Sequence, residues 1–423
     1  MRPVSVHHSA DAGLQPRSSS ERRGLSRRVS RILVVHNEIP FPPRHGGAVD
    51  VWWRLRAFAA LGHSVLLCCW RRRGDAAGQL QAELAEHGIE LASFTRRRRV
   101  GALWSHRPPQ MVSLGLRGTE WRRLVELGRA FAPSWVLADG WPNADVALAL
   151  GAALGRPVVY RSQNAEHEYW ASLLASARWP LRWRIALTAG RVRGVEAEIR
   201  AKAIAVLEIA EEDAATCAGA GMVGHSIYLP PTWSGVAREA ERPPTWDVLY
   251  GGNLWAPNNV EGLRWLLEAV VPRIRERVGT FRVVVAGAAP TAAVRRMCAA
   301  TGVEIIADPE DLGSVMRRAG VLVNPVLRSG GVNLKVLEML AAGAPIVSTS
   351  AGARGLPAAV RRVLTLADEP GAFAQAVAAR LLAPATTDAG SRQHLLDDAF
   401  GHARVASAVR EIDALCAQQT RAR

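Results

Sequence analysis

A lysine and a glutamate stand in a segment that is otherwise apolar or small. The segment reads SGGVNLKVLEMLAAG (329–343) and follows an apolar run with the pattern of a buried strand. A strand, a glycine-rich turn and a helix N-terminus together bind anions, because free backbone N–H groups and the positive end of the helix dipole point at the ligand. Gly330 and Gly331 would let the backbone approach a phosphate, and Lys335 would reach the same anion. The pattern predicts a phosphate site, with an exposed i,i+3 ion pair as the alternative.

The second charged residue, Glu338, lies one turn beyond Lys335 in the same predicted helix. A carboxylate at this position is suited to accept hydrogen bonds from ligand hydroxyls. Of the 53 lysine and arginine residues in the chain, only Lys202 and Lys335 are lysines. This choice indicates a local need for a compact point charge.

A second glycine pair occurs near the start of the chain. Gly46 and Gly47 follow the apolar run RILVV (31–35) and precede a helical pattern at 49–62, so they predict a second backbone N–H site. The spacing G-x-G-x-x-G is absent after this run, and Gly287, after VVVAG, is followed by Ala-Ala-Pro. The sequence therefore disfavours a bound dinucleotide.

Short apolar runs alternate with helical patterns in two series, which predicts parallel sheets covered on both faces. The predicted strands lie at 31–35, 64–70, 134–139, 157–162 and 203–209, and then at 247–253, 281–287, 303–308, 319–326 and 344–350. Ligands of such sheets bind at the carboxyl ends of the strands. With two such domains, the cleft between them is the natural site.

A proline-rich stretch separates the two series and sets the predicted domain boundaries. We expect a disordered basic tail over 1–30, a first domain over 31–228, a linker over 229–246, a second domain over 247–390 and a helical tail over 391–423. The expected fold class is α/β, with two doubly wound Rossmann-like domains that face each other across a cleft.

Charge is distributed unevenly along the chain. Residues 1–200 hold 30 Lys and Arg against 16 Asp and Glu, whereas residues 201–423 hold 23 against 22. The basic first half suits an anionic surface or substrate, and scattered arginines that keep the protein soluble are the alternative. Five cysteines without metal-type spacing, and no apolar run of membrane-helix length, favour a reducing, cytoplasmic setting.

Three basic segments carry open alternatives. The runs RRR (71–73) and RRRR (96–99) indicate a solvated face or a contact with anionic lipid. The stretch RWPLRWRIALTAGRVR (178–193) mixes Trp, Leu and Arg. It favours a core-facing helix with an arginine-rich outer face over a helix that lies on a membrane.

The body from about 31 to 385 resembles the family 4 retaining glycosyltransferases of GT-B fold. The matching pieces are PFPPRHGGAVDVWWRLRAFAALGHSV, YRSQNAEHEYW, YGGNLWAPNNVEGLRWLLEAVVPRI and VLVNPVLRSGGVNLKVLEMLAAGAPIVSTSAGARGL. The last piece is the most specific, because its strand, turn, Lys, Glu, small-residue helix end and Pro-Ile-Val strand fall in family order.

The resemblance implies a role for each candidate residue. Gly46 and Gly47 would contact the donor diphosphate. Lys335, helped by Arg328 and the amides of Gly330 and Gly331, would hold the leaving phosphate. Glu338 would bind the ribose hydroxyls. The first domain would bind the acceptor, and Asn164, Glu166 and His167 would line the cleft.

The chain also departs from the family pattern at three positions. Most members carry a glutamate eight residues before Glu338, where this chain has Gly330. Many members place an arginine and a lysine after the first strand of the second domain, and these regions here read Asn253 and Asn258. The resemblance places both asparagines at the donor and leaves the positive clamp to Arg328 and Lys335.

The expected function is transfer of a sugar from a nucleotide diphosphate to a lipid-linked glycan or polysaccharide precursor, with retention of configuration. We expect no metal and no other cofactor, since no DxD motif or cysteine cluster occurs. A small secondary-metabolite acceptor, an epimerase of the same fold and a basic membrane- or nucleic-acid-binding protein are the alternatives. Nucleic acid is disfavoured, because aromatic residues make up only 6% and show no RNA-stacking pattern. A peripheral position at the inner face of the cell membrane would suit a lipid-linked acceptor.

Overall fold

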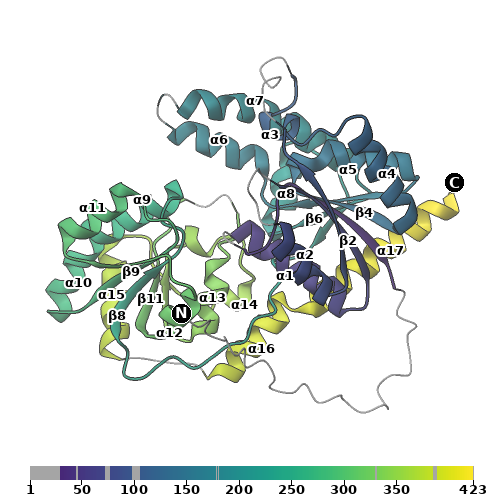
Figure 1. The fold of residues 1–423 in the computed structure, drawn as a ribbon. Coiled ribbons are helices and arrows are strands. Elements are labelled where there is room, and N and C mark those ends of the chain that lie inside the picture. Colours follow the sequence, from purple (N-terminus) through teal and green to yellow (C-terminus); the bar gives the residue numbers. More distant parts are fainter. Residues whose placement is uncertain are drawn as a thin grey trace, which may run out of the picture.

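The computed structural model describes residues 29–43, 46–71, 77–97, 105–177, 179, 181–328, 331–383 and 388–422. Each of the two sheets is built from parallel strands (Figure 1). Both sheets have strands that are buried on both faces, as the apolar runs predict. The tail predicted over 1–30 falls almost wholly outside the described residues.

The first sheet has seven strands in the order β3-β2-β1-β4-β5-β6-β7. Its strands are β1 (Arg31–His36), β2 (Ser64–Arg71), β3 (Ile89–Thr95), β4 (Trp135–Asp139), β5 (Val158–Ser162), β6 (Ala205–Glu208) and β7 (Ser226–Tyr228). Alternate residues of β1 point to opposite faces, so Leu33 and Val35 enter one hydrophobic core while Ile32 and Val34 enter the other.

Helices cover both faces of this sheet. One face packs against α1 (Gly46–Ala60), α2 (Ala77–Glu86) and part of the C-terminal helix α17 (His402–Ala422). The other face packs against α4 (Thr119–Phe131), α5 (Ala144–Leu154) and the inner part of α7 (Leu181–Lys202). The short α3 (Pro109–Val112), α6 (Glu166–Ser176) and α8 (Glu211–Gly219) complete the domain.

The second sheet has six strands in the order β10-β9-β8-β11-β12-β13. These are β8 (Trp246–Gly251), β9 (Val283–Gly287), β10 (Glu304–Ala307), β11 (Ala319–Asn324), β12 (Ile346–Ser348) and β13 (Thr365–Leu366). One core lies under α12 (Leu312–Arg317), α13 (Lys335–Ala342), α14 (Ala358–Arg361) and α16 (Ala389–Phe400). The other lies under α9 (Pro257–Trp265), α10 (Val271–Val278), α11 (Ala292–Thr301) and α15 (Pro370–Leu382).

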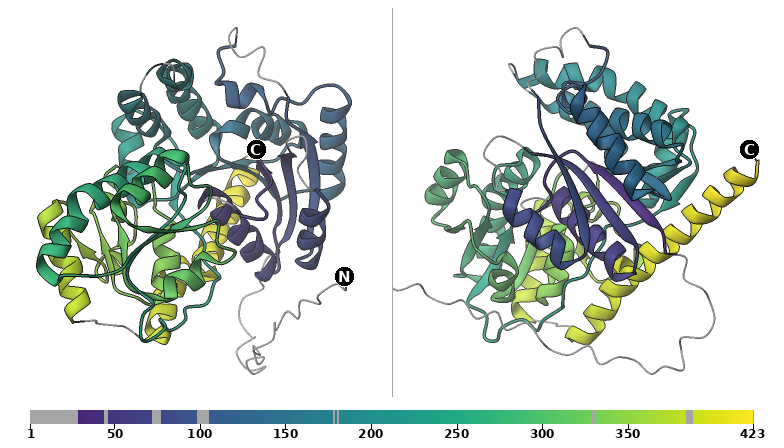
Figure 2. Two further views of the ribbon diagram at one scale, coloured as in Figure 1. Left: turned by 60° about the vertical axis from the view of Figure 1, so that its left-hand side comes forward. Right: turned by 45° about the vertical axis from the view of Figure 1, so that its right-hand side comes forward.

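Two segments cross between the sheets. Residues 229–241 run without helix or strand along the second domain, where the amide of Arg238 donates to the Ala341 carbonyl at 2.8 Å. The yellow helix α17 runs back to the first domain (Figures 1 and 2), where Asp413 accepts hydrogen bonds from Ser30 Oγ at 2.6 Å and Trp135 Nε1 at 3.1 Å.

The two doubly wound parallel sheets confirm the predicted fold class. Three strands, β3, β7 and β13, were not predicted. Strand β3 mixes polar and apolar residues because it lies at the edge of the sheet, and the other two are only three and two residues long.

The prediction of a core-facing helix over 178–193 is wrong for its first half. Trp183 is 58% exposed, and no described residue between 182 and 187 is buried. Only from Thr188 onward does α7 reach the core of the first domain.

Candidate active site between the two sheets

The strand order reverses between β1 and β4 in the first sheet and between β8 and β11 in the second. Ligands of doubly wound sheets bind outside the carboxyl ends of the strands at such a switch point. The glycine pair at 46–47 follows β1, and the segment 325–334 follows β11. Both predicted anion sites therefore lie where this fold places its ligands.

The two glycine turns lie against each other across the domains. A Cβ on Gly46, the first residue of α1, would lie 3.2 Å from Leu334 Cδ1. A Cβ on Gly331 would lie 1.9 Å from Asn164 Oδ1, closer than any side chain allows. A larger residue at 331 would displace the Asn164 side chain, and this close approach brings predicted donor and acceptor residues together. The neighbouring Gly330 lies outside the described residues.

A further contact closes the same side of the interface. Arg354 of the second domain lies 3.6 Å from the Glu168 carboxylate at the start of α6. The adjacent Gly355 has a φ of +72° and approaches Ala210 of the first domain, where a Cβ would lie 3.1 Å from the alanine methyl group.

Lys335 occupies the first turn of α13 and points at the carboxyl end of β8. Its Nζ lies 4.8 Å from the centroid of the Tyr250 ring and 3.6 Å from the position of a Cβ on Gly252. This Nζ is buried, and no described residue offers it a hydrogen bond. Burial lowers the pKa of Lys335 to about 7. Among the described residues, the face of the Tyr250 ring is the one favourable contact that we find for the charged form of Lys335.

Glu338 lies on the same half-buried side of α13. Burial, together with the charge of Asp311, raises the pKa of its carboxyl group to about 7. No described residue donates a hydrogen bond to this carboxylate. Val336, Leu337 and Leu340 anchor the opposite side of the helix in the core, so the lysine and the glutamate share the side that faces away from it.

A buried polar network fixes the loop that leads into α13. Asn324, the last residue of β11, donates to Ser348 Oγ and to the Gly352 carbonyl, both at 3.1 Å. Its Oδ1 accepts a hydrogen bond from Asn333 Nδ2 at 3.1 Å. The network ties Asn333, two residues before α13, to the ends of β11 and β12.

Arg328 is engaged by a carboxylate. Its Nη2 lies 2.6 Å from each oxygen of Glu261 in α9, and both side chains are about half exposed. Exposed ion pairs of this kind contribute about 0–1 kcal/mol, so a phosphate can compete with Glu261 for the guanidinium.

The two asparagines after β8 differ in their surroundings. Asn253 caps its own loop by accepting a hydrogen bond from the Trp255 amide at 3.2 Å, whereas Asn258 is exposed in the first turn of α9. The neighbouring Asn259, which sequence reasoning missed, donates to the Asn253 carbonyl at 3.0 Å and receives the Tyr250 hydroxyl on its own carbonyl.

A buried network of four charged side chains anchors α1 and was not predicted. Asp50 accepts hydrogen bonds from Arg54 at 2.5 Å, from Arg161 at 3.2 Å and from the Thr232 amide at 3.0 Å. Arg54 also donates to Asp139 at the end of β4. Although burial alone would raise it, Arg54 and Arg161 lower the pKa of Asp50 to about 2. The network fixes the helix that begins with Gly46.

The predicted acceptor residues form a second polar cluster, at the start of α6. Asn164 Nδ2 and Trp170 Nε1 each donate to the Glu166 carboxylate at 3.2 Å, and burial raises the pKa of Glu166 to about 8. His167 Nδ1 lies 2.8 Å from Glu196 of α7, which also accepts the backbone amides of Glu166 and His167. The structure thus places Asn164 against Gly331, whereas the His167 side chain of α6 binds Glu196 of α7.

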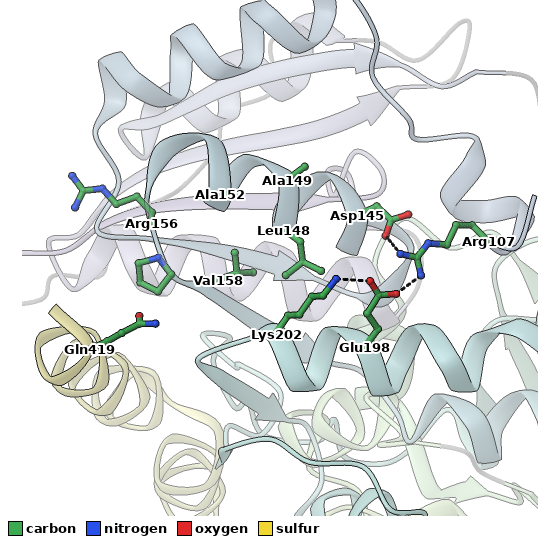
Figure 3. A pocket seen from close by; sticks show the side chains of 11 residues that line it. Arg107, Asp145, Leu148, Ala149, Ala152, Arg156, Val158, Glu198, Lys202 and Gln419 are labelled. Atoms are coloured by element: carbon green, nitrogen blue, oxygen red, sulfur yellow. Dashed lines mark hydrogen bonds and ion pairs between the residues drawn. The ribbon is translucent and has the colours of Figure 1, made fainter. Parts of the chain in front are cut away.

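Two other features of the first domain are a group of three possible metal ligands and a surface hollow, and most of their charged side chains pair with one another. His167, Glu196 and Cys217 have ligand atoms within 4.8 Å of one another, but Glu196 already accepts both backbone amides and the histidine. A hollow of about 580 Å³ lies between α5 and α7 (Figure 3). Its charges pair with each other, since Arg107 binds Asp145 and Glu198, and Lys202 binds Glu198. Among the described charged side chains that line the hollow, only Arg156 has no ion pair, so the hollow offers a ligand no cluster of unpaired charges.

The chain is similar in fold to solved structures of known proteins. The HepE protein of Anabaena in complex with UDP and glucose superposes with a TM-score of 0.60 at 12% identity, covering 90% of this chain and 99% of that one. The lipopolysaccharide outer core galactosyltransferase WaaB superposes with a TM-score of 0.55 at 13% identity, covering 90% and 99%. An uncharacterised 44.6 kDa protein in the cps region of Klebsiella pneumoniae is 23% identical over 362 residues, which are 82% of this chain and 90% of that protein.

The fold is therefore that of the GT-B glycosyltransferases, as the resemblance predicts. Residues 246–383 match the family model "Glycosyl transferases group 1", and this range includes Lys335, Glu338 and Arg328. Assignment to family 4 in particular stays a prediction. No helix among the described residues combines the length and apolar character needed to span a membrane.

Proposed function

We propose that this chain is a retaining glycosyltransferase that moves a sugar from a nucleotide diphosphate to a glycan acceptor. The observation that carries the proposal is the buried, unpartnered Nζ of Lys335, in the domain whose glycine turn contacts Gly46 and Asn164. A buried ammonium without a carboxylate is costly, and a bound diphosphate would supply the missing charge.

Transfer of the sugar requires that the departing diphosphate be stabilised. When the bond between the anomeric carbon and the diphosphate breaks, negative charge develops on phosphate oxygens. Lys335, the amides at the glycine turns and Arg328, once released from Glu261, would stabilise that charge. Glu338 would accept hydrogen bonds from the ribose hydroxyls. Glu338, the carboxylate on the same side of α13 as Lys335, is assigned to the ribose, so no nucleophile is assigned and a front-face displacement with the departing phosphate as the base is favoured.

The acceptor class rests on the relatives. One is named for its place in a cps region and another is a lipopolysaccharide outer core galactosyltransferase, which supports a glycan or lipid-linked acceptor over a small metabolite. Free cysteines, four of them buried, suit a reducing compartment such as the cytoplasm. Thermal-shift screening of nucleotide sugars, followed by NMR of the product's anomeric configuration, tests the proposal. Inversion at the anomeric carbon, or release of epimer without an acceptor, would contradict it.

Activity is expected to be independent of divalent metal. Cationic side chains and helix ends would neutralise the diphosphate, so EDTA should leave turnover within about twofold, because no Lewis acid is asked to supply transition-state stabilisation. Initial rates with and without EDTA, and after addition of Mg²⁺ or Mn²⁺, provide the measurement. Loss of activity with EDTA that either metal restores would mean that the diphosphate is bound in another way.

Replacement of Glu338 by alanine is expected to weaken donor binding with little change in kcat. The lost hydrogen bonds involve a charged acceptor and are worth roughly 1.5–3 kcal/mol, or about 10- to 150-fold in donor KM. They exist in both the ground state and the transition state, so the rate constant should change little. Steady-state kinetics with varied donor checks this, with the exposed Glu276→Ala of α10 as control. An unchanged donor KM would remove Glu338 from the donor site.

A further inference from the structure

Helices α6 and α7 form a hairpin that projects from the first domain (Figure 1). Among the described residues from Tyr169 to Leu187, none is buried. The apolar side chains of this part, such as Leu173, Leu174 and Ile185, are only half covered by the partner helix. The hairpin tip is therefore an apolar structure that the rest of the molecule leaves largely open.

Tryptophan is concentrated at the tip of this hairpin. Trp179 is 84% exposed and Trp183 is 58% exposed, whereas Trp135 and Trp70 in the strands are fully buried. Exposed tryptophans in one place mark an interaction site, since their large apolar area gains most from burial. The indole ring, apolar with one polar N–H, is the side chain most enriched at the boundary between lipid and water.

The same segment carries charge of a single sign. Residues 169–195 contain five arginines and no aspartate or glutamate. Arg182 and Arg184 flank Trp183 and are both exposed. A protein interface depletes charge at its centre, whereas an anionic lipid surface attracts each arginine and admits tryptophan between the headgroups. The alternation of Arg and Trp at the hairpin tip therefore fits an anionic lipid surface better than a protein interface.

We propose that the tip of the α6–α7 hairpin docks on an anionic membrane surface, with Trp179 and Trp183 between the headgroups and Arg182 and Arg184 on the lipid phosphates. The other end of α6 begins beside Asn164 at the cleft. A helix of 11 residues spans about 16 Å, so the docked tip holds the cleft within that distance of the lipid surface. Docking would present a lipid-carried acceptor to the cleft, and that role rests on the proposed function. The docking itself does not depend on it.

Cosedimentation of the full chain with vesicles tests the docking. Vesicles of phosphatidylcholine with phosphatidylglycerol are compared with vesicles of phosphatidylcholine alone, at low and high salt. Each arginine near an anionic surface contributes about 1 kcal/mol, so Arg182→Ala/Arg184→Ala should lower partitioning to the anionic vesicles about 30-fold. Trp179→Ser/Trp183→Ser should lower it at both salt concentrations, because insertion of indole is not screened. The matched control is Arg273→Ala/Arg277→Ala on exposed turns of α10, which should bind like the wild type.

Several outcomes overturn the docking. The docking would be contradicted if the wild type and the hairpin variants partitioned equally to anionic vesicles. Residues 1–28, which every variant retains, would then account for any binding. A dimer lost in the tryptophan variants, without vesicle binding, would assign the tip to a second copy of the chain. RNA binding lost in the arginine variants, again without vesicle binding, would assign it to another polyanion. Vesicle binding needs no turnover, so failure of the proposed transferase reaction leaves this test intact.

Discussion

Replacement of Lys335 by alanine should lower kcat about 10²- to 10³-fold and leave the fold intact. Loss of one preorganised contact to a developing oxyanion has this magnitude in other enzymes. The folded protein should lose nothing, because a buried ammonium without a hydrogen-bond partner is an unfavourable group in the empty site. Steady-state kinetics and thermal unfolding measure the two effects separately.

The chain contains its own control for this prediction. Lys202 is the other lysine, and it is exposed on α7 in an ion pair with Glu198 at 2.7 Å. Lys202→Ala should keep wild-type turnover. Because the pKa of Lys335 is about 7 in the empty site, binding of nucleoside diphosphate above neutral pH should also take up protons, and calorimetry in buffers of different ionisation enthalpy detects this. Near-normal turnover of Lys335→Ala would rule out the phosphate-clamp role.

Replacement of Arg54 by methionine should destabilise the first domain by about 3–5 kcal/mol. The substitution leaves Asp50 and Asp139 buried at the ends of α1 and β4 without their shared cation, and removal of one partner from a buried ion network has this cost. Thermal unfolding followed by circular dichroism measures the loss. The loss should grow as pH rises from the acidic range, because burial without Arg54 favours the protonated form of Asp50 in the variant, whereas the wild-type pKa of about 2 keeps Asp50 ionised.

An exposed ion pair serves as the comparison for Arg54. Arg97 lies 2.5 Å from Glu120, and both side chains are partly open to solvent. Arg97→Met should change stability by less than about 1 kcal/mol. If Arg54→Met cost no more than Arg97→Met, the buried network would not anchor α1. Restoration of stability by the added change Asp50→Asn would support the shared-cation account.

The sequence predicts the strands and the glycine turns well because these depend on local patterns. Fully apolar runs such as VVVAG can only be buried strands in a covered sheet, and a glycine pair before a helix has few other uses. The sequence also shows that Lys335 and Glu338 interrupt an apolar helix, and their roles at the donor stay predictions.

The unpredicted parts depend on contacts between distant segments. No local pattern marks the four residues of the buried charge network, because helix α1 and the parallel strands β4 and β5 bring them together from distant parts of the chain: Asp50, Arg54, Asp139 and Arg161. The pairing of Arg328 with Glu261 joins residues 67 positions apart. Trp183 read as a core residue because a helical pattern does not reveal how far a helix extends beyond the body that it packs on.

Helix α17 also bears on how the protein is made. Val405, Ala408, Val409 and Ile412 of this helix enter the core of the first domain beside Ile32 and Phe58. A ribosome completes the seven strands of that domain long before it reaches these residues. The domain that emerges first therefore waits, with part of one apolar face uncovered, until the second has been synthesised, although domains usually fold in order of synthesis. Its nascent form is a natural client for chaperones, and nascent chains released before and after α17 should differ sharply in protease resistance.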